Sequence, residues 1–265
     1  NHNGDVKIAK KIIKNAKLAG FDAVKFQKRN PDICVPEKKK SALKETPWGI
    51  MSYLNYKKKI ELNYKQFTEI DNYCKKLKID WFVSCWDEDS VKFIKKFKVK
   101  YHKVASAMIT NKKLLSEIAK QRKLTFISTG MSTYKDINAA ISIFKKYKCE
   151  YLLMHSVSVY PCPDELLNLK MIKILNEKYK SNIGYSGHES STIPSLIAAA
   201  MGARAIERHI TLKRTMWGTD QSASLEFNGM RTLVDYVRRF EKSLGSGKKF
   251  ILPEEKGKLS DQKYW

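Results

Sequence analysis

Lysine, serine and histidine side chains recur at the ends of short apolar segments in this 265-residue chain. Lys25 and Lys103 each stand among apolar neighbours, where an unpaired ammonium group would be costly to bury. Hydroxyl groups follow segments of the same kind at Ser106, Ser128 and Ser186. Two ammonium groups with several hydroxyl donors suit a phosphate or a carboxylate, so the pattern predicts an anionic substrate. An outward salt bridge to a neighbouring helix is the alternative for each lysine.

Two histidines, His188 and His209, end consecutive segments that are separated by one expected helix. Parallel strands joined by a right-handed crossover are neighbours about 4.8 Å apart, so both imidazoles could reach one metal ion. Glu207 and Asp220 are close to them in sequence. Two imidazoles without a thiolate leave positions open for oxygen ligands, which suits Mn²⁺ better than a closed zinc site. Each histidine alone could instead be a hydrogen-bonded structural residue.

The segments that carry these residues alternate with segments of helical spacing. The first of these segments ends at Gly20, a residue that often follows a helix. The expected helices are 5–20, 64–77, 90–97, 112–121, 134–147, 168–179, 193–201 and 230–244, and the expected strands are 23–27, 81–85, 102–105, 125–128, 151–157, 182–185 and 205–209. Because each strand is followed by a crossover, the alternation predicts a parallel sheet, interrupted only by residues 29–61.

Two architectures satisfy this alternation, an open doubly wound sheet and a (β/α)8 barrel. No glycine-rich dinucleotide motif and no phosphate-binding lysine loop follows an expected strand, which disfavours nucleotide cofactors. A barrel needs eight strands in about 250 residues. Since only seven strands are expected and the chain opens without Met, we expect an α/β, TIM-type (β/α)8 barrel that lacks its first strand in this chain. The barrel domain would span residues 1–245, and a charged C-terminal tail would span 246–265.

Composition limits the partners of the protein. Its 51 Lys+Arg against 27 Asp+Glu give a formal net charge of +24, but the lysines are spread over helix faces, so no nucleic acid is expected. No apolar run approaches the roughly 20 residues of a transmembrane helix, and no signal-peptide pattern opens the chain. No membrane partner and a cytoplasmic location are therefore expected. The five cysteines include no Cys-x-x-Cys pair and are expected to be reduced thiols.

Seven short segments of the sequence match the pattern of one known family. They are Asn-His-Asn-Gly-Asp at 1–5, Val-Lys-Phe-Gln at 24–27, Ser-Thr-Gly-Met at 128–131, Ile-Gly-Tyr-Ser-Gly-His-Glu at 183–189, Ile-Glu-Arg-His-Ile-Thr-Leu at 206–212, Trp-Gly-Thr-Asp-Gln at 217–221 and Ser-Leu-Glu at 224–226. In this collinear order, over nearly the whole chain, the sequence resembles the sialic acid synthases, a family of nonulosonate synthases.

The resemblance implies a phosphoenolpyruvate-condensing transferase of carbohydrate biosynthesis. The main expectation is an N-acetylneuraminate synthase, which condenses phosphoenolpyruvate with N-acetylmannosamine, or a related acetamido-sugar, to a nine-carbon sialic acid and phosphate. A legionaminate-type synthase with a different sugar is one alternative, and a catalytically weakened barrel that serves as a binding subunit is another. The resemblance also implies a divalent metal, Mn²⁺ before Mg²⁺ or Co²⁺, and a homodimer.

The resemblance further implies a role for each candidate residue. The catalytic residues would be Lys25, Tyr160, Glu207 and Asp220, and the metal would be bound by His188 and His209. Phosphoenolpyruvate would be bound by Lys25, Lys103, Ser106, Ser128 and Ser186. The sugar would be bound by Gln27, Ser158, Tyr160, Glu207 and Asp220.

The chain departs from the family pattern at three positions near these residues. Many members have Thr, Glu and Asn where Cys85, Met108 and Ser158 stand. A glutamate of the family's first strand and the family's small antifreeze-like C-terminal domain have no counterpart in the sequence. These departures leave the phosphate and metal groups in place, but the identity of the sugar stays open.

Overall fold

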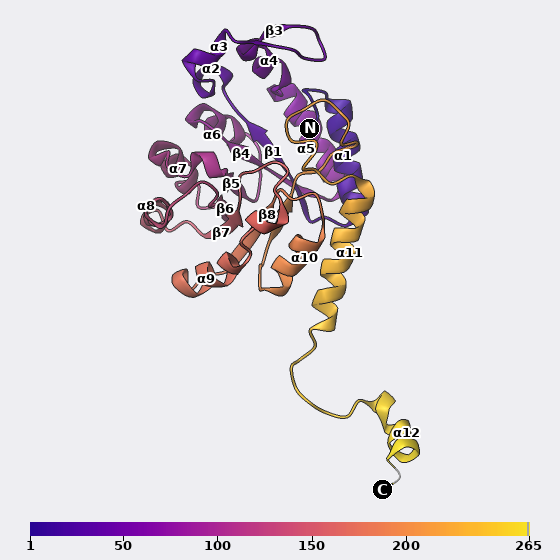
Figure 1. Cartoon of the computed structure of the whole chain (residues 1–265). Helices are drawn as coiled ribbons and strands as arrows, with labels where there is room; N and C mark the ends of the chain where they lie inside the picture. The colour runs from indigo at the N-terminus through magenta and orange to yellow at the C-terminus, as the bar shows by residue number, and fades with distance from the viewer. Residues whose placement is uncertain (264) are drawn as a thin grey trace.

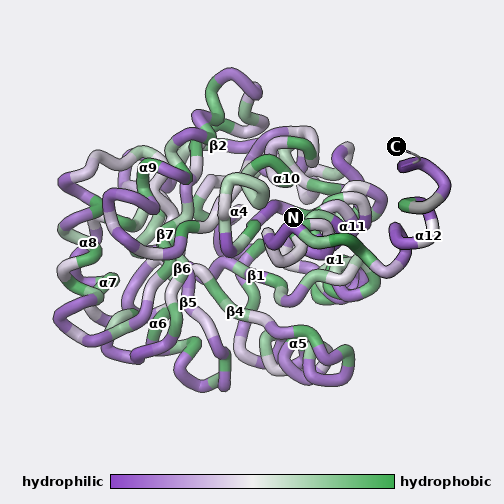
Figure 2. The backbone as a smooth tube through the Cα atoms, turned by 90° about the horizontal axis from the view of Figure 1, so that it is seen from below, coloured by the Kyte–Doolittle hydropathy of each residue, from purple (hydrophilic) through white to green (hydrophobic). Residues whose placement is uncertain are grey.

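A parallel sheet of seven strands forms the centre of the computed structural model, which describes residues 1–263 and 265. The strands are β1 (Ala23–Lys28), β4 (Asp80–Cys85), β5 (His102–Val104), β6 (Thr125–Ser128), β7 (Tyr151–Ser156), β8 (Ile183–Gly187) and β9 (Ile206–Arg208), in that order across the sheet. Figure 2 shows β1, β4, β5, β6 and β7 as an arc with helices outside it. The predicted parallel α/β sheet is confirmed. It is a curled half-barrel, because within the described residues no ladder joins β1 to β9 and a closed eight-stranded ring is not formed.

The eight expected helices are all present, with ends that differ from the prediction by at most three residues. They are α1 (Val6–Ala19), α5 (Tyr64–Leu77), α6 (Glu88–Ile94), α7 (Lys112–Ala119), α8 (Tyr134–Lys146), α9 (Lys170–Tyr179), α10 (Ile193–Ala200) and α11 (Phe227–Ser243).

Helix α1 shows why such segments are helical. The Asp5 carboxylate accepts hydrogen bonds from the backbone N–H groups of Lys7 and Ile8, which would otherwise lack partners at the first turn. Gly20 ends the helix in the left-handed conformation, at φ 93°, that glycine adopts without a steric penalty. The apolar face of the helix is buried in the core at Ala9, Ile12, Ile13, Ala16 and Ala19.

The region between β1 and α5, for which no element was predicted, is structured. It contains α2 (Pro31–Cys34), α3 (Glu37–Lys40), an antiparallel hairpin of β2 (Leu43–Lys44) and β3 (Met51–Ser52), and α4 (Tyr53–Ile60). Figure 1 shows these elements grouped at the top of the view, beyond the end of β1. These elements therefore form an additional layer at one end of the half-barrel.

The C-terminal segment after α11 contains one more helix, α12 (Pro253–Gln262), within the predicted charged tail 246–265. Figure 1 shows α12 at the end of an extended segment, away from the sheet. Residue 264 of the predicted tail lies outside the described residues.

Two of the expectations from composition can be compared with the structure. All five cysteines are free thiols, as predicted. Among the described residues, no helix combines the length and the apolar character needed to cross a membrane.

Candidate functional site

The edge strands β1 and β9 border a cavity of about 610 Å³ that reaches the carboxyl ends of the strands. Its walls include Lys25 and Gln27 of β1, Glu207 of β9, and Ile12 and Ile13 of α1. In barrels of parallel strands, chemistry takes place at the carboxyl ends, where loops bring side chains from several strands together. The cavity therefore joins the gap between the two edge strands to the end of the sheet at which the candidate residues were predicted.

Glu207 is the centre of a charged cluster. Its Oε1 atom accepts hydrogen bonds from Lys25 Nζ at 2.9 Å and from Ser186 Oγ at 3.0 Å. Lys103 Nζ lies 3.1 Å from the same oxygen. The alternative of outward salt bridges to helices is wrong for both lysines, because their partner is on β9 inside the half-barrel. The prediction that Glu207 faces the sugar stays a prediction, since its carboxylate here lies between two ammonium groups.

The charges of this cluster are not balanced. Burial alone would raise the pKa of Glu207, but the ammonium groups of Lys103 and Lys25 outweigh it and hold that pKa well below its usual range. Burial lowers the pKa of Lys103 to about 8, although the Glu207 carboxylate opposes this shift. Two ammonium groups thus share one carboxylate, and the cluster keeps a net positive charge. Because the cluster is partly shielded from water, this charge attracts a further anion strongly.

Hydroxyl groups without partners surround the same strand ends. The Oγ atoms of Ser84, Ser156 and Ser158 are buried and have no hydrogen-bond partner in the part of the chain that the structure describes. Ser106 Oγ accepts a hydrogen bond from the backbone of Gly130 at 3.1 Å. A Cβ atom at residue 130 would lie only 2.6 Å from Ser158 Oγ and 2.8 Å from Ser106 Oγ. Glycine therefore allows the hydroxyl groups to converge, and unsatisfied donors of this kind favour an oxyanion ligand.

Two of these hydroxyls were not among the predicted site residues. Ser84 of β4 lies in register with Lys103 on β5 and with Gln27 on β1. Ser156 is the last residue of β7, opposite Ser186 of β8. Both residues stand at strand ends in the sequence, and that position was the signal by which they could have been found. Ser128, which was predicted, is buried at the end of β6.

The two predicted metal ligands lie side by side. The ring centroids of His188 and His209 are 5.4 Å apart. Nδ1 of His188 lies 2.6 Å from the carbonyl oxygen of Val157, so this nitrogen carries the proton and Nε2 is left as an acceptor. Burial lowers the pKa of His188, and burial with the nearby Lys25 charge lowers the pKa of His209 to about 3. Both rings are therefore neutral near pH 7, the form that binds metals.

The donor set fits a divalent metal that takes further ligands from water or substrate. Among the described residues, no group of three or more His, Cys, Asp or Glu side chains is arranged to bind a metal ion by itself. Asp220 is the nearest carboxylate to the pair along this loop, with Oδ2 4.0 Å from Nδ1 of His209. Two neutral imidazoles would need oxygen ligands from water or substrate to complete such a site, so the metal expected from the sequence stays a prediction.

Two of the predicted sugar-binding residues, Tyr160 and Asp220, lie close to the histidine pair. The ring of Tyr160 lies 4.1 Å from that of His188 and 5.9 Å from that of His209, and it is 43% exposed. Gln27 lies at the cavity wall, where its side-chain oxygen accepts a hydrogen bond from Arg29. Tyrosine, amide and carboxylate groups are thus present at one opening, where sugar hydroxyls could be bound.

The positions that depart from the family pattern provide no acidic group here. Cys85 is buried at the end of β4, and Met108 packs against the main core. The carboxylates that line the cavity are those of Asp22, Glu61, Glu207 and Asp220.

Comparisons with known proteins agree with this geometry. The model of the NeuB family matches residues 12–249. The chain is 36% identical to N,N'-diacetyllegionaminic acid synthase of Campylobacter jejuni, over 97% of this chain and 78% of that protein. It is 34% identical to N-acetylneuraminate-9-phosphate synthase of Mus musculus, over 96% of this chain and 72% of that protein. A crystal structure of sialic acid synthetase from Leptospira borgpetersenii, in complex with citrate, superposes with a TM-score of 0.87 at 32% identity, covering 100% of this chain and 88% of that one.

Proposed function

The chain belongs to the NeuB family, whose relatives are synthases of sialic and legionaminic acids, and from this membership we propose an N-acetylneuraminate synthase-like activity. The substrates would be phosphoenolpyruvate and N-acetylmannosamine or a related acetamido-sugar. The observation that carries the proposal is the position of the Lys25, Lys103 and Glu207 cluster beside the His188 and His209 pair at one opening. An anion site and an aldehyde site are needed together for this condensation.

Phosphoenolpyruvate would lie over the charged cluster. Lys25 and Lys103 would bind its carboxylate and phosphate, whose negative charge compensates the ammonium group that Glu207 leaves unbalanced. The converging hydroxyl groups would donate the remaining hydrogen bonds, at Ser84, Ser106, Ser128, Ser156 and Ser186. This arrangement would hold C3 of the enol toward the histidine pair and keep the phosphate in place until it leaves.

The sugar would enter from the exposed side of the cavity. Tyr160, Gln27 and Asp220 would bind its hydroxyl and acetamido groups, so that the aldehyde carbon faces C3 of phosphoenolpyruvate. A carbon–carbon bond then forms between these two atoms, and the aldehyde oxygen takes up a proton. Water adds at C2, and cleavage of the bond between C2 and the phosphate oxygen yields phosphate and the 2-keto acid.

A divalent metal, Mn²⁺ before Mg²⁺ or Co²⁺, is part of the proposal. The free Nε2 atom of His188 and the neutral ring of His209 fit such an ion. When bound, it would supply Lewis-acid polarisation of the aldehyde oxygen. The hydrogen bond from His188 to Val157 would hold the ring in the tautomer that ligation requires.

The proposal also includes a homodimer and a cytoplasmic location. The five free thiols are consistent with a reducing compartment. Light scattering after size-exclusion chromatography measures the mass of the particle, and a monomer at micromolar concentration would contradict the homodimer.

Phosphate release tests the function. The protein is incubated with phosphoenolpyruvate, Mn²⁺ and each of several acetamido-sugar aldehydes, and released phosphate is measured together with the nine-carbon product by mass spectrometry. Release with N-acetylmannosamine supports the leading proposal, whereas release only with a diacetamido-sugar supports the legionaminate-type alternative, as in the Campylobacter relative. Binding of phosphoenolpyruvate without release with any sugar would contradict both and favour a binding subunit.

A further inference from the structure

The side chain of Gln27 faces the interior of the half-barrel. Successive side chains of a strand point to opposite faces, and Lys25 of β1 reaches Glu207 inside the half-barrel. Gln27 is two residues further along β1, so it lies on the same face as Lys25 and closer to the carboxyl end of the strand. It lines the same cavity. The amide of Gln27 is therefore in a position to contact a ligand in that cavity.

Arg29 determines which end of the Gln27 amide is free. The guanidinium of Arg29 donates a hydrogen bond to the side-chain oxygen of Gln27. Arginine has five donors and no acceptor, so the opposite orientation would bring the amide NH2 group against another donor. The oxygen of the amide is therefore held by Arg29. Nε2 of Gln27 has no hydrogen-bond partner in the part of the chain that the structure describes, and it is left as a donor for a ligand.

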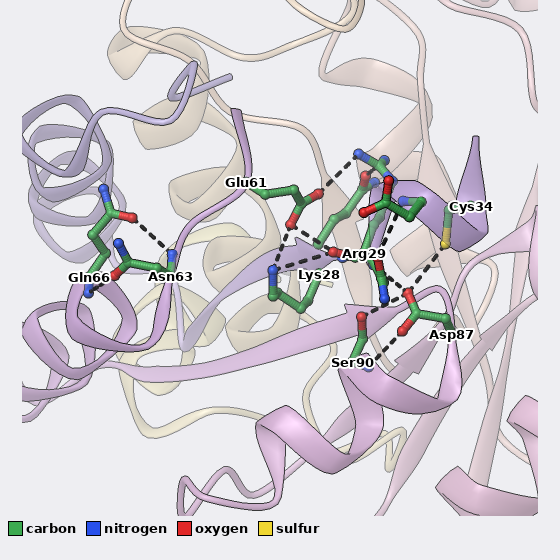
Figure 3. Close-up of polar contacts among 11 residues, drawn as sticks. Lys28, Arg29, Cys34, Glu61, Asn63, Gln66, Asp87 and Ser90 are labelled. Atoms are coloured by element: carbon green, nitrogen blue, oxygen red, sulfur yellow. Dashed lines mark hydrogen bonds and ion pairs between the residues drawn. The ribbon is translucent and has the colours of Figure 1, made fainter. Parts of the chain in front are cut away.

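The guanidinium of Arg29 is itself held by two further neighbours. It makes a cation–π contact with the ring of Trp86, 4.4 Å from the centroid. It also lies 3.8 Å from Glu61, whose carboxylate accepts a closer hydrogen bond, of 3.1 Å, from Lys28. Figure 3 shows Glu61 between Lys28 and Arg29. Ring, carboxylate and amide together restrict the movement of the guanidinium.

The backbone on both sides of this guanidinium is fixed as well. The N–H group of Arg29 donates to Oε2 of Glu61 at 3.2 Å, and that of Asn30 donates to Oδ2 of Asp87 at 2.6 Å. Asp87 is buried and caps α6 by accepting a hydrogen bond from the N–H group of Ser90 at 2.7 Å, as Figure 3 shows. The Arg29 side chain therefore starts from a rigid backbone that is joined to the end of β4 and the first turn of α6.

An amide held in this way restricts the ligand group that Gln27 can bind. Its nitrogen can donate to a hydroxyl or a carbonyl oxygen, but it cannot accept the proton of a hydroxyl or an N–H group. Because Gln27 is already oriented, binding does not have to order a side chain with several rotatable bonds. For one such side chain, the ordering weakens binding roughly 2- to 10-fold.

We propose that Arg29 is a positioning residue that fixes the amide of Gln27 with Nε2 toward the cavity, where it donates a hydrogen bond to an oxygen atom of the acetamido-sugar. This rests on the proposed function, in which Gln27 binds the sugar and not phosphoenolpyruvate. Arg29 acts on the sugar through Gln27, since its guanidinium is already directed to Gln27, Trp86 and Glu61.

Steady-state kinetics of Arg29 variants test this role. Phosphate release is measured with the acetamido-sugar that the wild type uses. Arg29→Leu leaves the Gln27 amide free to turn, so the KM for the sugar should rise roughly 3- to 10-fold, with kcat and the KM for phosphoenolpyruvate changed by less than about two-fold. Arg29→Lys keeps a donor for the Gln27 oxygen and should lose less. Arg239→Leu is the matched control, since Arg239 is exposed on α11, pairs with Asp235 and does not line the cavity.

Variants of Gln27 test the donor and its dependence on Arg29. Gln27→Leu removes one hydrogen bond, so the KM for the sugar should rise about 10-fold. Addition of Arg29→Leu to this variant should raise it by less than about two-fold more, because the two residues act as a unit. Gln27→Glu still accepts from Arg29 but has no donor for the sugar, and it should raise the KM as much as Gln27→Leu.

Three kinetic results would overturn the proposal while leaving the proposed function intact. Additive effects of Arg29→Leu and Gln27→Leu would show that Arg29 does not act through Gln27. A wild-type KM for the sugar in Gln27→Glu would show that Gln27 is not a donor. An equal rise of both KM values in Arg29→Leu would show a general disturbance of the site. Circular dichroism checks each fold, and Arg29→Lys replaces Arg29→Leu in every comparison if the leucine variant does not fold.

Failure of the proposed function would be recognised separately, because the wild type would then release no phosphate with any sugar. Calorimetric titration with N-acetylmannosamine would in that case decide about Arg29 and Gln27. Binding that is weakened in Arg29→Leu and in Gln27→Glu, and kept in Arg239→Leu, would support the proposal. Binding that is absent from the wild type, or equal in all four proteins, would contradict it.

Discussion

Glu189 and Arg208 form an ion pair of 2.9 Å in which neither side chain is exposed to solvent. Glu189 follows His188 directly in the chain, and Arg208 directly precedes His209. The pair therefore joins β8 and β9 at the point where each strand presents one of the two imidazoles. We expect the spacing of the histidine rings to depend on this link between their sequence neighbours.

The surroundings of the pair satisfy most of its remaining hydrogen-bonding groups. The Glu189 carboxylate accepts hydrogen bonds from Tyr185 at 2.9 Å and from Ser195 at 2.8 Å. The guanidinium of Arg208 donates to the carbonyl oxygen of Ser191 at 2.8 Å. A buried pair with such partners is tolerated, whereas removal of one member would leave an uncompensated charge.

Replacement of Arg208 should therefore destabilise the protein. In Arg208→Met, the free energy of unfolding should fall by roughly 3–5 kcal/mol, because the Glu189 carboxylate stays buried without its partner. Urea denaturation measures this change. Arg238→Gln is the control, since Arg238 pairs with Asp22 at the exposed surface and its loss should cost only about 0–1 kcal/mol. Equal losses in the two variants would show that the buried pair has no special role.

The same pair should also affect metal binding. In the double variant Glu189→Gln and Arg208→Met, no buried charge is left, so part of the stability should return. The orientation of the two histidines would still be less well defined, and Mn²⁺ affinity should fall about 10- to 100-fold, the range for loss of groups that orient metal ligands. A double variant that binds Mn²⁺ as tightly as the wild type would contradict the positioning role.

The histidines themselves provide a direct test of the metal site. His188→Ala and His209→Ala should each abolish Mn²⁺ binding and turnover while the fold is kept, as measured by metal analysis of the dialysed protein and by circular dichroism. His155→Gln is a control within the same sheet, because His155 bonds to the carbonyl oxygen of Leu167 at 2.8 Å and is not part of the pair. Full Mn²⁺ occupancy in the protein lacking both His188 and His209 would rule out the proposed ligands.

The two interior lysines should affect phosphoenolpyruvate more than the sugar. Lys25→Met and Lys103→Met each remove one of two ammonium groups near Glu207, so the KM for phosphoenolpyruvate should rise roughly 10- to 100-fold, the effect of one charged hydrogen bond. The KM for the sugar should change far less. Lys100→Met is the control, since Lys100 is an exposed residue that pairs with Asp80 at 2.8 Å. If the variants unfolded while their folded fraction kept the wild-type kinetics, the lysines would be structural.

The regular part of the fold could be predicted from the sequence because its signals are local. Period-3.6 apolar spacing and short apolar runs depend on a few consecutive residues, and β6 (Thr125–Ser128) and α5 (Tyr64–Leu77) begin and end as predicted. The closeness of His188 and His209 also followed from sequence, because a right-handed crossover makes consecutive parallel strands neighbours.

Other parts of the site could not be predicted, for two physical reasons. The contact of Lys25 with Glu207 joins residues 182 positions apart and depends on the curvature of the whole sheet, which no local pattern encodes. The elements between β1 and α5 each have only two to eight residues, as in β2 (Leu43–Lys44), and are too short to show a period. Charges such as Arg29 were visible in the sequence, but their common position at the cavity was not.

The last prediction concerns the gap between β1 and β9. Each edge strand has one ladder partner among the described residues, β4 for β1 and β8 for β9, and the cavity of about 610 Å³ lies between them. Backbone groups at such edges lack the partners that a sheet provides. The walls of the cavity include Val24 of β1, Ile206 of β9 and Ile13 of α1, so an added strand could bury apolar side chains against them.

An N-terminal extension of about ten residues that forms a parallel strand, of the type strand-Glu-Ile-Gly, should therefore fill the gap, since adjacent strands are spaced about 4.8 Å apart. We expect the extended protein to unfold at higher urea concentration, to protect the amides of β1 and β9 from hydrogen exchange, and to bind Mn²⁺ and release phosphate better than the 265-residue chain. An extension of equal length with proline at alternate positions is the matched control, because proline cannot donate to a ladder. If both extensions gave the same urea midpoint and the same exchange rates, the added segment would not form a strand in the gap. If the 265-residue chain turned over at the rate of the extended protein, the site would need no further strand.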